Sequence, residues 1–249
     1  MKRPLSLLAN SELVSAAATC FIYLFYAIVL GASLFPSICL LALCNQRLSP
    51  LWSARSLAFF SLGCGCAIMV FFVSGTVVLS VAIRILSFGI KPGKYPMVSV
   101  TMVRWLVYSG LYNLAGRLIL TNVPMSFLLN LFFRIIGARI GKHVQLNSWF
   151  LNDAYLLTIG DNVVIGGKTD ISCHTFEKGF LILKNVTIGS GTLIGQRCYV
   201  SPGVTIGDHC IIGQYAFIRK NTVVPDRTTL SAIAGLPVRT VARIEKSEA

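Results

Sequence analysis

An aliphatic residue recurs at every sixth position over much of the C-terminal half of this 249-residue chain. Seven consecutive members of the series are Ile or Val: Ile188, Ile194, Val200, Ile206, Ile212, Ile218 and Val224. Compact residues fill the fifth place of these hexads: Thr192, Cys198, Val204, Cys210, Ala216 and Thr222. Each hexad can supply one short strand and a turn, with the aliphatic side chain inside and a glycine at the sharp corner. Stacked coils of three hexads then bury a continuous aliphatic column that no single hexad could bury.

The same period begins earlier in the chain, with a shift of phase. An earlier register contains Ile159, Ile165 and Ile171, and it is preceded one residue out of phase by Ile140 and Leu146. We therefore predict a parallel β-helix of roughly five coils over 140–230.

The segment ISCHTFEKG, residues 171–179, interrupts this repeat. Ile171 and Ile188 are 17 residues apart, one short of the roughly 18 residues of a full coil. The chain must therefore leave the coil and return to it. His174 and Glu177 fall in this excursion, and Glu-Lys-Gly gives it a polar, flexible tip.

The N-terminal third has the composition of a membrane protein. Hydrophobic residues make up 55% of the chain and charged residues only 12%. The apolar residues concentrate in 13–44 and 57–86, where Arg84 is the only charged residue. A bilayer core about 30 Å thick needs roughly 20 apolar residues as a helix, so each segment can span it once. Gly31 and Pro36 are expected to bend the first span.

The flanking cations predict which side of the membrane each end occupies. Six Lys or Arg residues precede the first span or end and follow the second, namely Lys2, Arg3, Arg84, Lys91, Lys94 and Arg104. Only Arg47 and Arg55 lie in the connector between the spans. The positive-inside rule then puts both termini, and everything after residue 87, on the cytoplasmic side of the membrane. A cleaved signal peptide is the alternative for the N-terminus, but the first apolar run exceeds the 7–15 residues of a signal core.

The net charge of +13 also belongs to the membrane-proximal half. Residues 1–142 contain twelve Lys or Arg and one acid, whereas 143–249 contain ten and eight. Cations near a bilayer are attracted to anionic headgroups, so membrane lipids are an expected partner. No nucleic-acid motif accompanies the charge, and we expect no nucleic-acid partner.

Residues 99–139 carry two helical patterns between the spans and the repeat. Polar residues recur every four positions among apolar ones, first as Ser109, Asn113 and Arg117, then as Ser126, Asn130 and Arg134. A narrow polar stripe on a wide apolar helix is typical of a helix lying in the membrane interface, which we favour. The alternative is that these helices pack on the β-domain or on each other. The predicted organisation is thus a transmembrane region over 1–98, interfacial amphipathic helices over 99–139 and a β-helix domain over 140–249.

These patterns resemble the hexapeptide-repeat acyltransferases. IRKNTVVPD (218–226) is similar to the exit from that family's last coil, and IAGLPVRTV (233–241) to its terminating stretch. The resemblance is closer to a membrane-bound branch at the C-terminus of poly-lysine synthetase-like proteins, in which spans precede GARIG (137–141), TIGD (158–161) and a His-x-Phe-Glu motif. It implies a left-handed parallel β-helix, a homotrimer, and acetyl-CoA as acyl donor.

The resemblance also implies roles for particular residues. His174 matches the family's loop histidine, which acts as general base, and a neutral imidazole suits that task. Glu177 could orient the imidazole, as carboxylates do in hydrolase triads, or could bind the acceptor. The candidates for coenzyme A binding are Lys220, Arg219, Arg239, Gly235 and Arg197, of which Lys220 and Arg239 match basic family positions and Arg219 and Arg197 rest on charge alone.

Other reactive residues fit less demanding roles. His143 and His209 hold the same place in their hexads and are expected to be solvated corner residues. The three histidines lack a close pair, so we expect no metal site. Cys173 adjoins His174, but nothing in the sequence marks it as an activated thiol. The eight cysteines are expected to be compact apolar fillers and not a disulfide framework.

Two classes of function fit these observations. The first is an integral-membrane acyltransferase that moves an acetyl group from acetyl-CoA to a hydroxyl, or an amine, of a membrane-associated glycan or glycolipid. The second is a non-catalytic, membrane-tethered trimeric scaffold or binding module, since solenoids often serve only for binding. The loop histidine and its neighbouring glutamate favour the enzyme.

Overall fold

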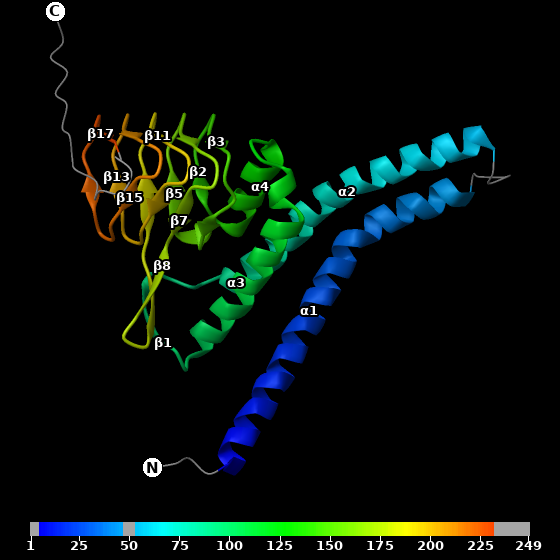
Figure 1. Cartoon of the computed structure of the whole chain (residues 1–249), viewed down its shortest axis with the longest axis horizontal. Coiled ribbons are helices and arrows are strands. Elements are labelled where there is room, and N and C mark those ends of the chain that lie inside the picture. The colour runs from blue at the N-terminus through cyan, green and yellow to red at the C-terminus, as the bar shows by residue number, and fades with distance from the viewer. Residues whose placement is uncertain (1–4, 47–52, 232–249) are drawn as a thin grey trace, which may run out of the picture. The chain divides into compact units, whose positions relative to one another are not determined.

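The computed structural model describes residues 5–46 and 53–231 and divides into two compact units, Met1–Leu79 and Ser80–Ala249 (Figure 1). The first unit contains α1 (Leu5–Gln46) and most of α2 (Ala54–Ser87). Within these helices, Thr19–Gln46 and Ala54–Ser87 are long and apolar enough to cross a membrane. Ser74 Oγ donates a hydrogen bond of 2.7 Å to the carbonyl of Ser33, which ties α2 to α1. The helices include both predicted spans and continue beyond them.

Pro36 lies inside α1, as the expected bend requires. Proline has no N–H and its ring clashes with the preceding turn, so it kinks a helix. Figure 1 shows α1 changing direction in its second half.

The second unit begins with the end of α2 and two further helices. β1 (Gly93–Pro96) leads into α3 (Val100–Leu118), the short 3₁₀ helix η1 (Leu120–Asn122) and α4 (Phe127–Ile136). Ser99 and Ser126 cap α3 and α4 by accepting backbone N–H groups, and α4 ends at Gly137 in the left-handed conformation.

Short parallel strands then form three sheets that run along the stacked coils. Two sheets have five strands each, in the orders β16-β13-β10-β5-β2 and β17-β14-β11-β6-β3, and the third has four, in the order β15-β12-β7-β4. The strands are β2 (Arg139–Ile140), β3 (Gln145–Leu146), β4 (Leu151–Asn152), β5 (Leu157–Ile159), β6 (Val164–Ile165), β7 (Asp170–Ser172), β10 (Val186–Ile188), β11 (Leu193–Ile194), β12 (Tyr199–Val200), β13 (Thr205–Ile206), β14 (Ile211–Ile212), β15 (Phe217–Ile218), β16 (Val223–Val224) and β17 (Thr229–Leu230). The predicted left-handed β-helix of five coils is confirmed.

The aliphatic series forms the core of this β-helix. Ile159, Ile188 and Ile206 are partners in successive coils, and all three are buried. The compact fifth-place residues are buried as well, except Thr222, which is half-buried, and several donate to a carbonyl of the next coil. Thr192 Oγ1 donates to Gly207 over 2.9 Å, and Cys198 Sγ to Gly213 over 3.1 Å. These hydrogen bonds explain why small polar side chains recur inside the column.

The corner glycines serve a different purpose from the one expected. Gly195 does not have a positive φ angle; a Cβ on it would lie 2.5 Å from the backbone nitrogen of Gln214 in the next coil. Such glycines are therefore required by close packing between coils. The left-handed residues at the corners are mostly not glycine, and they include His143 and His209.

The interruption after Ile171 is a long insertion and not a coil one residue short. Between Val200 and Ile206 the chain passes from the sheet of β7 and β12 to the sheet of β10 and β13 in six residues. Between Ile171 and Ile188 it passes between the same two sheets in 17 residues. The eleven extra residues form the hairpin of β8 (His174–Glu177) and β9 (Phe180–Leu183).

The second polar stripe faces the protein and not the membrane. Asn130 Nδ2 donates to the carbonyl of Val144 over 2.9 Å, and Arg134 Nη2 donates to that of Gly141 over 2.8 Å. Ser126 is the helix cap. α4 therefore covers the open end of the first coil, where edge carbonyls need donors. For this face of α4, packing on the β-domain is the correct alternative.

The two isoleucines of β14 allow a test of which aliphatic side chains form the core. Ile212 is fully buried and Ile211 is half exposed on the outer face. We expect Ile212→Ala to destabilise the fold by about 2–5 kcal/mol, because it leaves a cavity. Ile211→Ala should cost less than about 1 kcal/mol. The thermal unfolding midpoints of both variants in detergent measure the difference, and equal losses would contradict the assignment of the core.

Candidate active site

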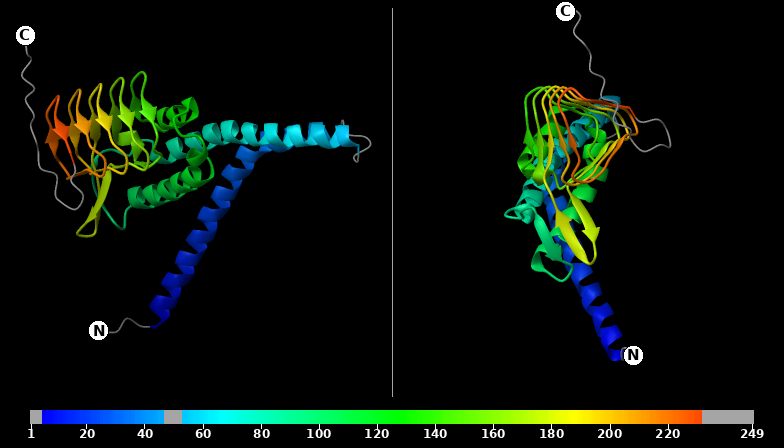
Figure 2. Two further views of the ribbon diagram at one scale, coloured as in Figure 1. Left: turned by 45° about the horizontal axis from the view of Figure 1, so that its top comes forward. Right: turned by 90° about the vertical axis from the view of Figure 1, so that its left-hand side faces the viewer.

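A three-stranded antiparallel sheet projects from the stacked coils (Figure 2). The β8–β9 hairpin turns at Lys178 and Gly179, both with positive φ. β1 pairs with β9 along Gly93–Pro96, and the Lys94 ammonium lies 4.0 Å from the centre of the Phe180 ring. The segment that follows α2 thus holds the hairpin from its outer side.

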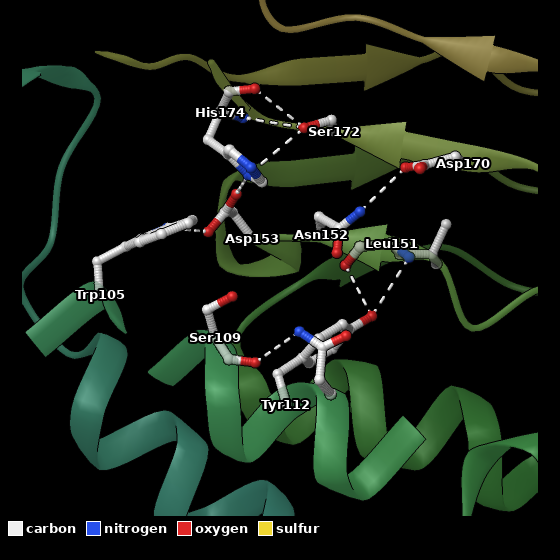
Figure 3. A network of polar contacts seen from close by, with 10 residues as sticks. Trp105, Ser109, Tyr112, Leu151, Asn152, Asp153, Asp170, Ser172 and His174 are labelled. Carbon is white, nitrogen blue, oxygen red and sulfur yellow. Dashed lines mark hydrogen bonds and ion pairs between the residues drawn. The ribbon is translucent and has the colours of Figure 1, made fainter. Parts of the chain in front are cut away.

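His174 stands at the base of this hairpin and is paired with a buried carboxylate (Figure 3). Its Nδ1 lies 2.5 Å from Asp153 Oδ2, and the Asp153 side chain is only 1% exposed. A carboxylate accepts hydrogen bonds, so this contact favours the tautomer with the hydrogen on Nδ1 and the lone pair on Nε2. The imidazole is 23% exposed, and no described residue is hydrogen-bonded to Nε2. Nε2 is therefore the ring nitrogen left to accept a proton.

Asp153 reaches this position because both residues follow the same sheet in successive coils. β4 pairs with β7 so that Asn152 lies beside Ser172, and Asp153 and His174 come just after these partners. Asp153 has a φ of 55°, which turns its side chain out of the coil path. The short helix η2 (Ala154–Leu156) follows it.

Sequence reasoning missed Asp153. The available signal was the phase shift between Leu146 and Ile159, which marks a second irregular corner. With the coils aligned, that corner stacks directly against the corner of His174.

Aromatic side chains surround the imidazole on the protein side. The ring of Trp105 lies 4.8 Å from that of His174 and 5.4 Å from that of Phe176. Ser172 Oγ donates to the carbonyl of His174 over 3.0 Å. The imidazole is thus held in one orientation by a carboxylate and by ring packing.

Of the two roles that the sequence leaves open for Glu177, orienting the imidazole does not fit its position. Its Oε1 lies 2.5 Å from Lys220 Nζ, and this hydrogen bond lowers the pKa of the Glu177 carboxyl. The reason is the alternation of β8, in which His174 and Glu177 are separated by three positions and face opposite ways. Asp153 takes the orienting place.

Glu177 and Lys220 line a cavity of about 170 Å³ beside the hairpin. Its other lining residues are Thr175, Ile182, Lys184, Pro202 and Asn221. Lys184 Nζ donates to Asn221 Oδ1 over 2.6 Å, so two ammonium groups face this space.

Cys173 is unsuited to be a nucleophile. Its side chain is fully buried, and burial raises the pKa of its thiol well above the usual range. The described cysteines are all free thiols. Among residues 5–46 and 53–231, no group of three His, Cys, Asp or Glu side chains is arranged to hold a metal ion.

Comparison with known proteins identifies the repeat. The family described as "Bacterial transferase hexapeptide (six repeats)" matches residues 185–220. The match falls within the stacked coils, over β10, β11, β12, β13, β14 and β15. A relative, the delta-poly-L-ornithine synthetase of Acinetobacter baumannii (strain AB307-0294), is 31% identical over 125 residues, or 50% of this chain. The chain spans only 9% of that protein's length.

Solved structures of acetyltransferases are similar as well. A galactoside acetyltransferase in complex with coenzyme A is 27% identical, with a TM-score of 0.36, over 43% of this chain and 56% of that one. A maltose O-acetyltransferase from Clostridium difficile 630 is 19% identical, with a TM-score of 0.45, over 62% and 94%. A hexapeptide-repeat acetyltransferase from Vibrio cholerae, complexed with acetyl coenzyme A, is 16% identical, with a TM-score of 0.46, over 66% and 99%.

The described members of the predicted coenzyme-binding set lie on two corners of the β-helix. Arg219 and Lys220 follow β15, at the same corner as the hairpin. Arg197 precedes β12 at another corner, where its Nη1 donates to the Tyr215 hydroxyl over 2.9 Å. Gly235 and Arg239, with the stretch 233–241, lie outside the described residues.

Proposed function

We propose that this protein is an integral-membrane, acetyl-CoA-dependent acyltransferase in which His174 is the general base. The observation that carries the proposal is the buried Asp153 carboxylate on Nδ1 of a part-exposed imidazole whose Nε2 is hydrogen-bonded to no described residue. This arrangement fixes the tautomer that can accept a proton and stabilises the imidazolium that forms. The hexapeptide-repeat match over 185–220 supports the same reaction class.

In the proposed reaction, Nε2 of His174 removes the proton from an acceptor hydroxyl as its oxygen attacks the carbonyl carbon of acetyl-CoA. The new C–O bond forms, the thioester C–S bond breaks, and the imidazolium returns the proton to the departing thiolate. An acceptor amine would react in the same way. Acetyl-CoA is a substrate here, and no acyl-enzyme is required, in keeping with the buried Cys173.

Coenzyme A needs cations for its phosphates, and the hairpin corner offers several. Lys220 and Arg219 are exposed there, and Lys184 lines the same cavity as Lys220. Arg197 lies at another corner, so it would reach the same coenzyme only from a neighbouring subunit. We therefore propose that the protein is a homotrimer, with coenzyme A bound between subunits. Gly235 and Arg239 stay in the proposed set. For Glu177 we propose acceptor binding, since it borders this cavity and does not touch the imidazole.

An exposed apolar surface beside the site favours a membrane-associated acceptor. Val98 is 98% exposed and Val100 79%, and Val103 and Leu106 continue this surface along α3. Trp105, between them in sequence, is buried against His174. One helix thus presents apolar side chains outward and an active-site residue inward. We propose that the outward face lies in the membrane interface and that the acceptor is a lipid-linked glycan or glycolipid.

A non-catalytic scaffold is the second candidate. Solenoid surfaces often serve only for binding, and half-exposed apolar residues such as Ile211 and Phe217 could support assembly. The scaffold does not require an oriented histidine, so the Asp153–His174 pair favours the enzyme.

The release of free thiol from acetyl-CoA, with extracted membrane glycolipids as acceptors, tests the base. We expect His174→Ala to lower the rate by about 100-fold or more, because a positioned base contributes that much. His209→Ala is the matched control and should retain activity, since His209 is an exposed corner residue.

Two carboxylate variants in the same assay distinguish the roles of Asp153 and Glu177. Asp153→Asn should approach the loss of His174→Ala, whereas Glu177→Gln should mainly raise the acceptor KM. Equal rates for wild type and His174→Ala would refute the assigned base. A chain that does not bind acetyl-CoA at all would favour the scaffold.

The proposed topology places both termini and the catalytic domain in the cytoplasm of a bacterial cell, at the inner membrane. Two apolar helices and the surplus of cations outside them support it. A reporter fused after Ala249 should therefore behave as cytoplasmic, with a fusion in the connector 47–52 as the opposite control. Periplasmic activity of the C-terminal fusion would overturn this orientation.

A further inference from the structure

The Asp153 carboxylate has a second partner that comes from outside the β-helix. Trp105 Nε1 donates to Asp153 Oδ1 over 2.7 Å, while His174 Nδ1 occupies Oδ2 (Figure 3). Trp105 is 5% exposed and belongs to α3. Each carboxylate oxygen is therefore bound by one donor, and the two donors come from different parts of the chain.

The indole is suited to this task by its chemistry. Its N–H can only donate, so it cannot compete with Asp153 for the hydrogen on His174. A hydrogen bond from a neutral donor to a buried charge is stronger than one between neutral groups. The same ring lies against the imidazole, 4.8 Å between centroids and inclined by 65°. One side chain thus restricts both members of the pair.

α3 is itself fixed to the first coils, so Trp105 is not free to move away. Tyr112, two turns further along α3, has its hydroxyl 2.5 Å from the carbonyl of Trp149, and this hydroxyl accepts the N–H of Leu151 over 3.2 Å. Gly116 packs so closely on the Trp149 ring that a Cβ there would overlap it. The tie to Leu151 lies only two residues before Asp153.

We propose that Trp105 is a positioning residue that holds Asp153, and through it His174, in the reactive orientation. The helix that bears the membrane-facing apolar surface then completes the active site. This inference rests on the proposed role of His174, although the packing of Trp105 on the pair can be tested without any assay of acetyl transfer.

The kinetic test uses Trp105→Phe in the full chain, which removes the N–H and keeps an aromatic ring. We expect kcat to fall about tenfold with the KM for acetyl-CoA within about twofold, since the variant loses orientation and not coenzyme contacts. On an Asp153→Asn background the same change should cost almost nothing, because the residue acts through Asp153. Trp52→Phe, outside the described residues, is the control. Equal losses on both backgrounds, or an unchanged kcat, would overturn the proposal.

A spectroscopic test separates this inference from the proposed activity. The chain has three tryptophans, so 5-fluorotryptophan labelling should give three ¹⁹F signals, and the one missing in Trp105→Phe belongs to Trp105. We expect this signal to shift in both Asp153→Asn and His174→Gln, with the Trp149 signal unmoved. If neither substitution shifts the Trp105 signal, the packing of Trp105 on the Asp153–His174 pair is refuted, whatever the enzyme's activity.

Discussion

The register between successive coils is the constraint on which the site depends. Parallel pairing aligns Leu151 with Ile171 and Asn152 with Ser172, so two corners 21 residues apart in sequence are stacked in space. Asp153 and His174 each leave the coil at that corner. The aliphatic column enforces this register, because a one-residue slip would turn inward side chains outward. Core packing in the hexads therefore determines the geometry of the Asp153–His174 pair, which itself lies outside the column.

The sequence predicted the regular part of this protein well and the irregular part incompletely. Period six identified the inward residues, because burial of one aliphatic side chain per strand is a local rule.

The hairpin was recognised as an excursion, but its length was not, since counting positions cannot distinguish a shortened coil from a long insertion. Asp153 was missed because its role follows from pairing between coils, and Glu177 was preferred because it is close in sequence. The stripe of Asn130 and Arg134 was misplaced for a similar reason. A polar helix face matches headgroups as well as the edge carbonyls of Val144 and Gly141.

The segment between α2 and the repeat contributes directly to the candidate site. β1 extends the sheet of the β8–β9 hairpin, and α3 carries Trp105 to Asp153. A β-helix without this segment would keep His174 and Asp153 but lose the donor on Oδ1 and the strand that pairs with β9. In the proposed function, the outward apolar residues of α3 lie in the membrane interface while its indole holds Asp153. That proposal gives a physical reason for joining the apolar helices and the repeat in one chain.

A structure of the full chain with coenzyme A would test most directly whether His174 is placed to act as the base. We expect the coenzyme thiol to lie at the base of the β8–β9 hairpin. It should be within hydrogen-bond distance of His174 Nε2, about 2.6–3.2 Å, directly or through one water. The Asp153–His174 contact should persist in that complex. A thiol bound at another corner, or an imidazole turned so that Nε2 faces Asp153, would contradict it.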